Sequence, residues 1–428
     1  MRHMKCCDII IPMRRTQLFT KTLRQAPADE TAKNAQLLIR AGFVHKEMAG
    51  VYAYLPLGLR VLNKIVQIIR EEMNTIGGQE ISLTALQNPL PWEATGRWDD
   101  SVMDAWFKTD LANGTTLGLA PTHEEPLAQA MRAFIHSYKD LPVYTYQFQT
   151  KFRNELRAKA GLMRGREFLM KDLYSFSRDE AEHAEFYDRA ADSYMKVFSR
   201  LGLGDTTYKT FASGGSFSKF SHEFQTVSPV GEDTIYVADA KNLAVNKEVL
   251  NDEVLAELNL ERNELREVSA VEVGNIFTLG TKYSAPIGLT FTDKDGAKQP
   301  VFMGSYGIGP SRLMGVIAEK FADEKGLVWP DNIAPFLVYL VRISDDAAVV
   351  KAADDLYDQL SARGIETLYD DSDARPGEKF TDADLLGIPH RIVVSPKLTE
   401  AGQFEYKSRT LDMVESLTQQ TLFAKLEK

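Results

Sequence analysis

The chain has 428 residues, of which 44% are hydrophobic and 26% are charged, a composition typical of globular proteins. This length allows two or three domains with sizeable cores. The formal net charge of −10 argues against non-specific binding of polyanions over the whole surface, so any contact with nucleic acid must use local basic patches.

The cysteines and the N-terminal segment indicate the cellular compartment. Cys6 and Cys7 are the only cysteines in the chain, and they are adjacent, so neither a disulfide framework nor a cysteine metal site is expected. This usage predicts a cytoplasmic protein. No apolar run approaches the roughly 18 residues of a membrane span. We expect residues 1–13 to be a disordered N-terminal extension.

The first part of the chain predicts helices followed by a strand. Residues Asp29–Ala41 have helical spacing of apolar side chains. A second amphipathic helix runs from Leu59 to Met73 and is ended by Gly77–Gly78. Residues Glu80–Leu86 then read as a strand. Periodicity alone favours a simple core role for the second helix.

The segment LGLAPTHEE, Leu117–Glu125, carries the first candidate site and leads into a predicted helix through about Tyr138. Thr122 and Glu124 could hold a cationic amine, because a carboxylate supplies charge and a hydroxyl supplies direction. The spacing alone favours another interpretation, in which Thr122 caps a helix whose first turn is acidic.

The stretch FRNELRAKAGLMRGREFLMKDLYSF, Phe152–Phe176, predicts a hairpin. Tyr144–Thr150 alternates as a strand, and an apolar return strand begins at Phe168. We expect Arg153 and Glu155 to share one strand face. The intervening basic loop suits a polyanionic ligand, because the planar guanidinium of arginine grips phosphate oxygens. A solvated hairpin with exposed ion pairs is equally compatible with the charges.

Further motifs lie between this hairpin and residue 330. A helix is predicted over Arg178–Arg200, and the Gly- and Ser-rich segment Phe211–Gln225 contains His222, although a lone histidine is more often structural. The segment Asn246–Glu267 is short and acidic and is predicted to be helical. The segment GSYGIGPSR, Gly304–Arg312, reads as strand, glycine turn and helix, which places N–H groups and the positive helix end at the turn.

The last part of the chain predicts a separate domain. Residues Trp329–Pro335 contain two prolines and read as a linker. Beyond them, predicted strands and helices alternate, which indicates an α/β domain with a mixed sheet.

The Phe152–Phe176 stretch resembles motif 2 of class II aminoacyl-tRNA synthetases, and specifically of bacterial-type prolyl-tRNA synthetases, in the pattern F-R-x-E followed by R-x-R-E-F-x-M-K-D-x-Y-S-F. The resemblance extends from about Arg14 to near the C-terminus. It implies an α+β catalytic domain with an antiparallel sheet over residues 14–328, a linker over 329–335 and an α/β anticodon-binding domain over 336–428. Motif 1 would lie at about 50–90, motif 2 at 148–176 and motif 3 at 300–322.

The resemblance also implies a role for each matching residue. Arg153 and Arg312 would be catalytic. The ATP-binding residues would be Arg153, Glu155, Arg164, Phe168, Gln225 and Arg312. The proline-binding residues would be Thr122, Glu124, Arg153, His222 and Gly307. The tRNA-binding residues would be Arg157, Lys159, Arg375, Lys379, Lys407 and Arg409, although each of these last side chains could equally be a solvated surface charge.

The implied activity is ligation of proline to tRNA(Pro), with Mg²⁺ accompanying ATP, no zinc and a homodimeric enzyme. The chain departs from the family pattern in several places, and two or three residues within Phe217–Phe220 look inserted. Thr84 replaces a motif 1 proline, and Asn275 replaces a histidine. The segment from about residue 246 to 267 is a short remnant where many bacterial relatives carry an editing domain. We therefore expect mischarging with alanine, which a separate deacylase would correct.

Two alternative functions are compared with the sequence. A sister class II enzyme with a zinc-dependent threonyl site is disfavoured, because no cysteine lies in the core. A non-enzymatic RNA-binding or amino-acid-sensing protein should have lost a motif residue, yet Arg153, Glu155 and Arg312 are all present.

Overall fold

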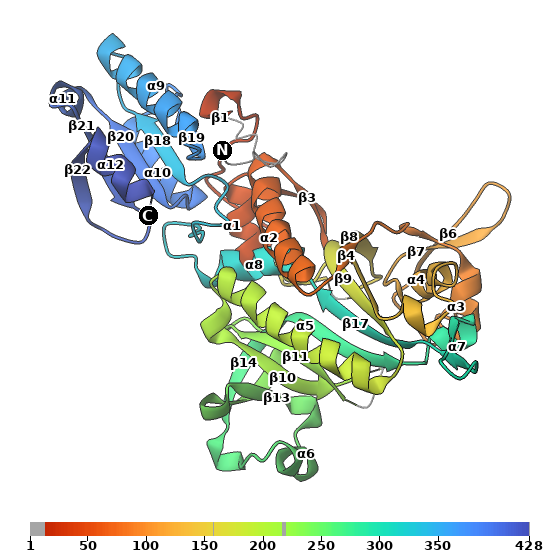
Figure 1. Cartoon of the computed structure of the whole chain (residues 1–428). Coiled ribbons are helices and arrows are strands. Elements are labelled where there is room, and N and C mark those ends of the chain that lie inside the picture. Colours follow the sequence, from red (N-terminus) through yellow and green to blue (C-terminus); the bar gives the residue numbers. More distant parts are fainter. Residues whose placement is uncertain (1–12, 157, 216–219, 428) are drawn as a thin grey trace. The chain divides into compact units, whose positions relative to one another are not determined.

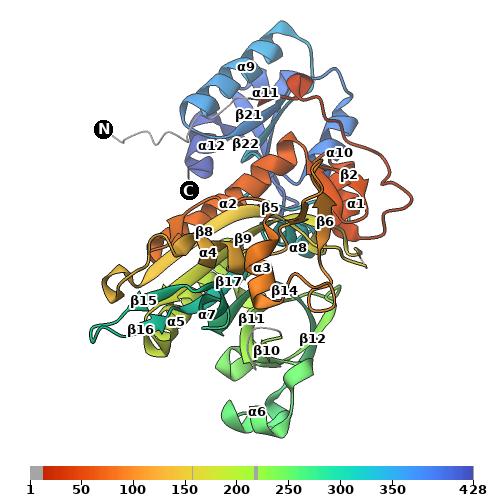
Figure 2. The same cartoon turned by 90° about the vertical axis from the view of Figure 1, so that its right-hand side faces the viewer.

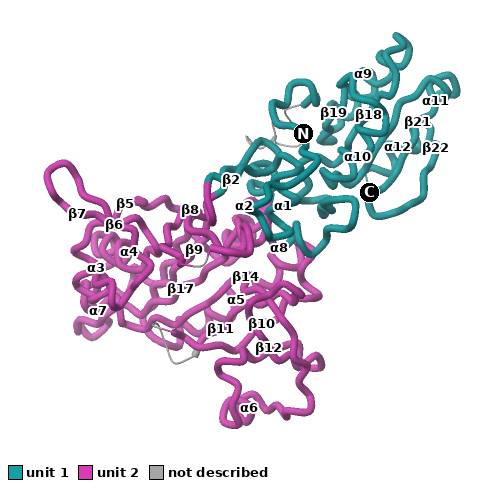
Figure 3. Tube along the Cα trace, turned by 180° about the vertical axis from the view of Figure 1, so that it is seen from behind, with its two compact units in different colours: residues 1–47, 52–64, 317–428 teal, residues 48–51, 65–316 magenta. Residues whose placement is uncertain are grey.

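The computed structural model describes residues 13–156, 158–215 and 220–427 (Figure 1). The chain divides into two compact units, coloured separately in Figure 3. Unit 1 comprises residues 1–47, 52–64 and 317–428, and unit 2 comprises residues 48–51 and 65–316. The division passes through α2 (Pro56–Thr75) and α8 (Pro310–Lys320). Of the predicted disordered extension, residues 1–12 lie outside the described part of the chain.

Unit 2 is built on a nine-stranded sheet. Its neighbours are antiparallel except for two parallel pairs, β10–β13 and β4–β8, so the predicted antiparallel α+β architecture is confirmed. In spatial order the strands are β11 (Phe220–Val227), β10 (Thr207–Ser213), β13 (Leu243–Asn246), β12 (Asp233–Ala238), β14 (Arg266–Gly280), β17 (Phe302–Ile308), β9 (Glu167–Ser177), β8 (Val143–Phe152) and β4 (Gln79–Glu80).

Helix α5 (Glu180–Arg200) covers one face of this sheet (Figure 2). The Asp179 side chain caps its first turn, and aromatic rings join it to the strands. The Tyr194 ring lies 5.0 Å from that of Phe224 on β11, and the Phe186 ring lies 5.3 Å from that of Tyr306 on β17. Because side chains alternate along a strand, the residues next to Tyr306 face the opposite side, where the candidate site lies.

Smaller elements of unit 2 surround that opposite face. Helices α3 (Pro89–Thr95), α4 (Glu124–Met131) and α7 (Ser284–Ile287) pack against one another. Two short sheets accompany them, formed by β5 (Leu86–Gln87), β7 (Thr116–Leu119) and β6 (Phe107–Asp110), and by β15 (Thr290–Thr292) and β16 (Lys298–Pro300). Helix α6 (Asp252–Glu257) lies between β13 and β14.

Two predictions for this region were too long. The predicted helix through Tyr138 ends at Met131, and the predicted strand Glu80–Leu86 pairs only at its two ends. In between, the Leu83 N–H donates to the Gln147 side chain at 2.9 Å, and the Leu83 carbonyl accepts from Gln149 at 2.5 Å. Side-chain amides thus satisfy the backbone where a neighbouring strand was expected.

Unit 1 contains the predicted mixed sheet. Its order is β1 (Met13–Arg14), β19 (Thr367–Asp370), β18 (Val338–Arg342), β20 (His390–Val394), β21 (Gln403–Ser408) and β22 (Val414–Thr418), with parallel pairing through β20 and antiparallel pairing beyond. The helices of this part are α9 (Ala347–Ala362), α10 (Pro376–Leu386), α11 (Pro396–Glu400) and α12 (Gln419–Leu426).

Some elements of unit 1 were not predicted from the sequence, namely β1, β22 and α11. Strand β1 comes from the N-terminal segment yet pairs with β19, and the Arg14 guanidinium lies 4.8 Å from the centre of the Tyr369 ring. Helix α1 (Lys33–Arg40) and the pair β2 (Val44–Met48) and β3 (Val51–Tyr54) are the remaining α-helix and strands of the described residues. Among the described residues, no helix has both the length and the apolar character that a membrane span requires.

Candidate active site

A pocket in unit 2 brings the three predicted motif arginines together, and we call it the arginine pocket. It lies between the turn after β8, the strands β9, β14 and β17, and the start of α8. Its lining includes Arg153, Glu155, Arg164, Phe168, Met170, Glu272, Asn275, Gly307 and Arg312. Segments more than 100 residues apart in sequence therefore converge on one pocket.

The spacing predicted Arg153 and Glu155 on one strand face, but this prediction was wrong. Strand β8 ends at Phe152, so Arg153 lies in the turn that follows it. In this turn the Glu155 N–H donates to the Arg153 carbonyl at 2.7 Å. The Arg153 Nε donates to the Pro121 carbonyl at 3.3 Å, and its guanidinium lies 5.3 Å from the centre of the Phe168 ring. Burial, together with the charge of Arg312, lowers the pKa of Arg153 from its usual value.

The other two arginines are held by carboxylates and carbonyls. Arg312 Nε donates to the Met163 carbonyl at 2.8 Å, and Arg312 Nη1 donates to the Glu272 carbonyl at 2.7 Å and to its carboxylate at 3.0 Å. Arg164 Nε donates to Glu155 at 2.9 Å and Arg164 Nη1 to Glu232 at 3.1 Å. Three guanidinium groups around one pocket suit a ligand with several phosphates.

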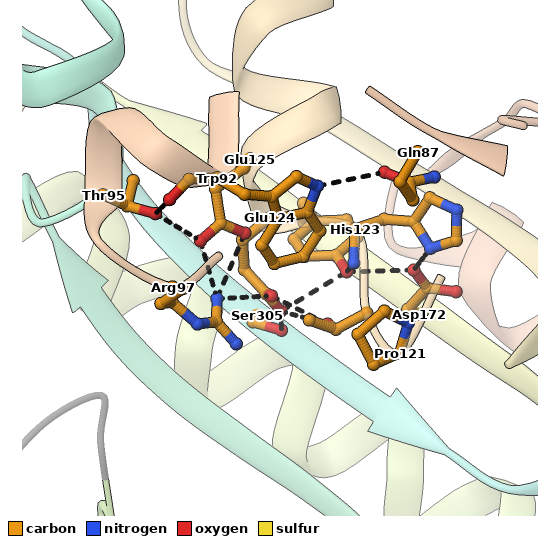
Figure 4. A network of polar contacts seen from close by, with 12 residues as sticks. Gln87, Trp92, Thr95, Arg97, Pro121, His123, Glu124, Glu125, Asp172 and Ser305 are labelled. Carbon is orange, nitrogen blue, oxygen red and sulfur yellow. Dashed lines mark hydrogen bonds and ion pairs between the residues drawn. The ribbon is translucent and has the colours of Figure 1, made fainter. Parts of the chain in front are cut away.

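The side chains of Thr122 and Glu124 meet, and Thr122 does not cap α4, whose N-cap residue is His123. Thr122 Oγ1 lies 2.7 Å from both carboxylate oxygens of Glu124, and Glu124 is only 2% exposed. The hydroxyls of Tyr174 and Ser305 also donate to Glu124, each at 3.4 Å. Figure 4 shows the surroundings of Glu124, with Arg97 and Glu125 on one side and His123 and Asp172 on the other. Because Arg153 bonds to the carbonyl of the residue before Thr122, this site adjoins the arginine pocket.

A buried polar chain supports the Thr122 segment from behind. The Lys151 ammonium contacts the His123 ring and donates to Asp172 at 2.8 Å, and Tyr174 donates to the same carboxylate oxygen at 2.9 Å. Burial and the charge of Lys151 lower the pKa of His123 to about 4. At neutral pH His123 is therefore uncharged and structural.

The structure does not bring His222 to the arginine pocket. Its Nδ1 lies 2.9 Å from the Tyr187 hydroxyl of α5, and its ring packs against those of Tyr187 and Phe211. Burial and the charge of Lys209 lower its pKa to about 3. Alternation along β11 places His222 on the α5 side, with Phe224, which was a signal present in the sequence.

The Gln225 side chain does not face α5 as His222 does, but it is not part of the lining of the arginine pocket either. Its Nε2 donates to Glu223 and to Asp233, at 2.9 Å each, and its buried Oε1 has no partner among the described residues. Asp233 lines a hollow next to the arginine pocket, together with Arg312 and Glu272. Burial and the charge of Glu272 raise the pKa of Glu223 to about 8.

The predicted tRNA-binding residues differ in exposure. Lys159 and Arg375 are exposed, Lys407 is partly exposed, and Arg157 lies outside the described residues. Lys379 is 3% exposed, and its ammonium donates to the carbonyls of Arg342 at 2.9 Å and Asp370 at 3.4 Å. Lys379 therefore links the last residues of β18 and β19. The Arg409 side chain donates to Asp323 at 2.5 and 2.6 Å. These last two side chains are engaged within the protein.

The sequence analysis missed several residues of the site, above all Glu272, Ser305 and Arg97. Glu272 is a carboxylate in the apolar run V-E-V before GNIF, and this was the available signal. Arg97 and Ser305 gave none, since their contacts join segments distant in sequence. In the described part of the chain, no group of three or more His, Cys, Asp or Glu side chains is arranged to hold a metal ion.

Two family models match this chain. Residues 107–321 match the tRNA synthetase class II core domain (G, H, P, S and T), and residues 337–428 match the anticodon binding domain. A proline–tRNA ligase of Phenylobacterium zucineum is 39% identical over 93% of this chain and 96% of its own length. One from Caulobacter vibrioides is 40% identical over 93% and 95%.

Solved structures show the same fold. A prolyl-tRNA synthetase of Cryptosporidium parvum in complex with L-proline and AMP superposes with a TM-score of 0.75 at 18% identity, covering 92% of this chain and 74% of the other. The same enzyme with halofuginone and AMPPNP gives a TM-score of 0.76. From the identity and coverage of the curated relatives, the chain belongs to the prolyl-tRNA synthetase family of class II aminoacyl-tRNA synthetases.

Proposed function

We propose that this protein is a proline–tRNA ligase, which activates proline with ATP and transfers it to the 3′ end of tRNA(Pro). The observation that carries the proposal is the convergence of Arg153, Arg164 and Arg312 on one pocket, next to the buried Glu124. A triphosphate and a cationic amine are the ligands that these two sites complement.

ATP occupies the arginine pocket in this proposal. Phe168 stacks on the adenine ring, and Glu155 accepts a hydrogen bond from the adenine amino group. Arg164 and Arg312 hold the distal phosphates, so that the triphosphate is bent. Gln225 acts through Asp233 at the margin of the site.

Proline lies beside ATP with its cationic nitrogen on Thr122 and Glu124. Gly307 forms part of the wall, since a Cβ there would lie 2.6 Å from Met170 and 2.7 Å from Asn275. We do not assign His222 to proline, because its ring packs against α5.

The reaction needs positioning and charge rather than an enzyme nucleophile. The proline carboxylate attacks the α-phosphate in line, which forms prolyl-adenylate and releases pyrophosphate. Arg153 neutralises the charge that develops on the α-phosphate oxygens. The terminal hydroxyl of tRNA(Pro) then attacks the prolyl carbonyl, and AMP leaves.

Mg²⁺ fits the donors next to the distal phosphate site. Glu272 and Asp233 supply carboxylate oxygens there, and Mg²⁺ is usually held by one or two carboxylates and by phosphate oxygens. The ion would offset phosphate charge when bound. Within the chain itself, Glu272 orients the Arg312 guanidinium.

The remaining partners follow from this activity. We propose a catalytic domain over 14–328 and an anticodon-binding domain over 336–428, with Lys159, Arg375 and Lys407 as the tRNA-contacting residues that the fold leaves accessible. The enzyme acts as a homodimer in the cytoplasm, and a separate deacylase removes alanine from tRNA(Pro).

Amino-acid-dependent exchange of labelled pyrophosphate into ATP tests this function. Proline should support exchange strongly and threonine should not. Exchange that depends on another amino acid would identify a sister enzyme, and no exchange with any amino acid would indicate a binding protein instead.

A further inference from the structure

A second carboxylate lies directly behind the Glu124 site. Arg97, which follows α3, points its Nη1 at two neighbouring residues of α4. This nitrogen lies 3.2 Å from Glu124 Oε2, and 2.9 and 3.1 Å from the two oxygens of Glu125. We call Arg97, Glu124 and Glu125 the carboxylate cluster (Figure 4). One guanidinium nitrogen therefore links the proposed amine ligand to a carboxylate that the substrate does not touch.

The carboxylate cluster is buried and has an unbalanced charge. Glu125 is fully buried, Glu124 is 2% exposed and Arg97 is 8% exposed. Among the described residues, Arg97 is the cationic side chain that forms ion pairs with both Glu124 and Glu125. With both carboxylates ionised the cluster carries one net negative charge, which is costly to bury. Either a proton or the cationic amine of a substrate can neutralise it.

The groups around Glu125 determine which of these occurs. Arg97 and the Thr95 hydroxyl, which donates at 3.0 Å, stabilise the ionised form from the α3 side. Glu124, on the same helix, opposes ionisation, and Tyr283 at the start of α7 lies against Arg97, 5.1 Å from ring centre to guanidinium. His123 and Asp172 lie beyond Glu124, and the Tyr174 hydroxyl donates to Glu124 at 3.4 Å. The charges of Lys151 and Arg153 also act on Glu124. Burial and the charge of Glu124 raise the pKa of Glu125 to about 7.

We propose that Glu125 is a positioning residue that exchanges a proton with solvent and, through Arg97, sets how strongly Glu124 binds the amino group of the substrate. When Glu125 is protonated, Arg97 balances the charge of Glu124 and the amine is held weakly. When Glu125 releases its proton to water, its charge balances Arg97, and Glu124 is left to balance the amine. This inference rests on the proposed function.

The KM for proline in pyrophosphate exchange, measured between pH 6 and pH 8.5 at saturating ATP, tests the proposal. A secondary amine stays protonated over this range. The wild-type KM should fall roughly fivefold as pH rises through about 7, with little change in kcat. In Glu125→Gln, which mimics the protonated form, the KM should stay near the wild-type pH 6 value throughout. A fall of KM in this variant, or its absence in the wild-type enzyme, would overturn the proposal.

Thr95→Val gives an independent answer if Glu125→Gln does not fold. This change removes one hydrogen bond from the ionised carboxylate with little change in shape, so the midpoint of the KM profile should move to higher pH. An unchanged midpoint would contradict the proposal. Glu182→Gln, at an exposed ion pair on α5, serves as the matched control and should keep the wild-type profile. Absence of proline-dependent exchange by the wild-type protein at every pH would instead reject the proposed function.

Discussion

At the scale of single residues, the arginine pocket contains one guanidinium that is held by several hydrogen bonds, Arg312, and one that can still donate to a ligand, Arg153. Arg312 is oriented by three hydrogen bonds to Met163 and Glu272. Arg153, by contrast, is held only by a 3.3 Å bond from its Nε to the Pro121 carbonyl and a 4.0 Å contact with the Met170 sulfur among the described residues, and its guanidinium faces Phe168 and the pocket. Arg153 is therefore placed to donate to a developing phosphate charge at little reorganisation cost.

Replacing Arg153 by alanine should remove this donation. Loss of one preorganised charge at the phosphorus costs on the order of 3–4 kcal/mol in the transition state, so pyrophosphate exchange should fall about 10²–10³-fold. The melting temperature should change little, since Arg153 holds no strand together. Arg178→Ala removes an exposed arginine outside the pocket and should retain full exchange. Near-normal exchange by Arg153→Ala would remove this residue from its role.

Replacing Glu124 by glutamine should weaken proline binding rather than ATP binding. A charge-assisted hydrogen bond is worth about 1.5–3 kcal/mol, so the KM for proline should rise roughly 10–100-fold. The KM for ATP, measured in the same exchange assay, should be unchanged and serves as the internal control. If both KM values rise together, the substitution has disturbed the whole site and the specific role of Glu124 is not supported.

At the scale of elements, the strands β14 and β17 form the floor of the site. Gly307 of β17 pairs with Asn275 of β14, and there is no space for a side chain at this point. Asn275 stands where the family usually has histidine, and its side chain donates to Glu272 at 2.7 Å. The floor thus positions the carboxylate that orients Arg312.

Gly307→Ala tests the floor. The added methyl group would lie 2.6 Å from Met170 Cε, a flexible side-chain end, so the sheet should form while the pocket narrows. We expect the KM for proline to rise at least several-fold, on the scale of the roughly 1–3 kcal/mol of an overpacked site. Gly377→Ala, where nothing lies within 4 Å of the new methyl group, is the matched control. Unchanged proline kinetics in Gly307→Ala would place the substrate elsewhere.

The sequence predicted long periodic elements well and short irregular ones poorly. Helix α5 begins within two residues of its predicted start and ends at its predicted last residue, Arg200, because its apolar spacing reflects burial. The segment 81–85 and α11 were not predicted correctly. In the segment 81–85, side-chain amides of β8 bond to the backbone in place of a neighbouring strand. Helix α11 has only five residues and begins after the N-cap Ser395, so it has no long apolar pattern.

The candidate site was predictable where local motifs carry it. The resemblance supplied Arg153, Glu155, Arg164, Phe168 and Arg312, and the structure places these residues around one pocket. The resemblance alone did not place His222 and Lys379 correctly, because the role of each residue depends on which side of its strand or helix faces the core. For His222 the alternation along the strand was the signal available in the sequence. The contact of Arg97 with α4 joins segments that only the tertiary fold brings together.

At the scale of the whole molecule, the short connection between β13 and β14 affects fidelity. Residues 247–265 form only α6 and two turns of 3₁₀ helix, whereas a folded domain needs about 50 residues or more. A proline pocket cannot strongly exclude alanine, because small apolar differences are worth about 1–3 kcal/mol. We therefore expect this enzyme to attach alanine to tRNA(Pro) at a measurable rate.

Alanine and tRNA(Pro) together test this consequence. The purified enzyme should accumulate Ala-tRNA, because the described connection between β13 and β14 is too short for an editing domain. The half-life of added Ala-tRNA(Pro) should be the same with and without the enzyme. Pro-tRNA(Pro) is the control for spontaneous hydrolysis. Rapid enzyme-dependent loss of Ala-tRNA would show that hydrolysis occurs within this chain.

The central claim is that distant arginines fold ATP into a bent conformation beside a captured proline. A crystal structure with proline and a non-hydrolysable ATP analogue tests it most directly. The α-phosphate should lie within hydrogen-bonding distance of Arg153, the γ-phosphate near Arg312, and the proline nitrogen on Glu124 and Thr122. An extended triphosphate that leaves Arg312 without a phosphate contact, or a proline nitrogen bound away from Glu124, would contradict the account.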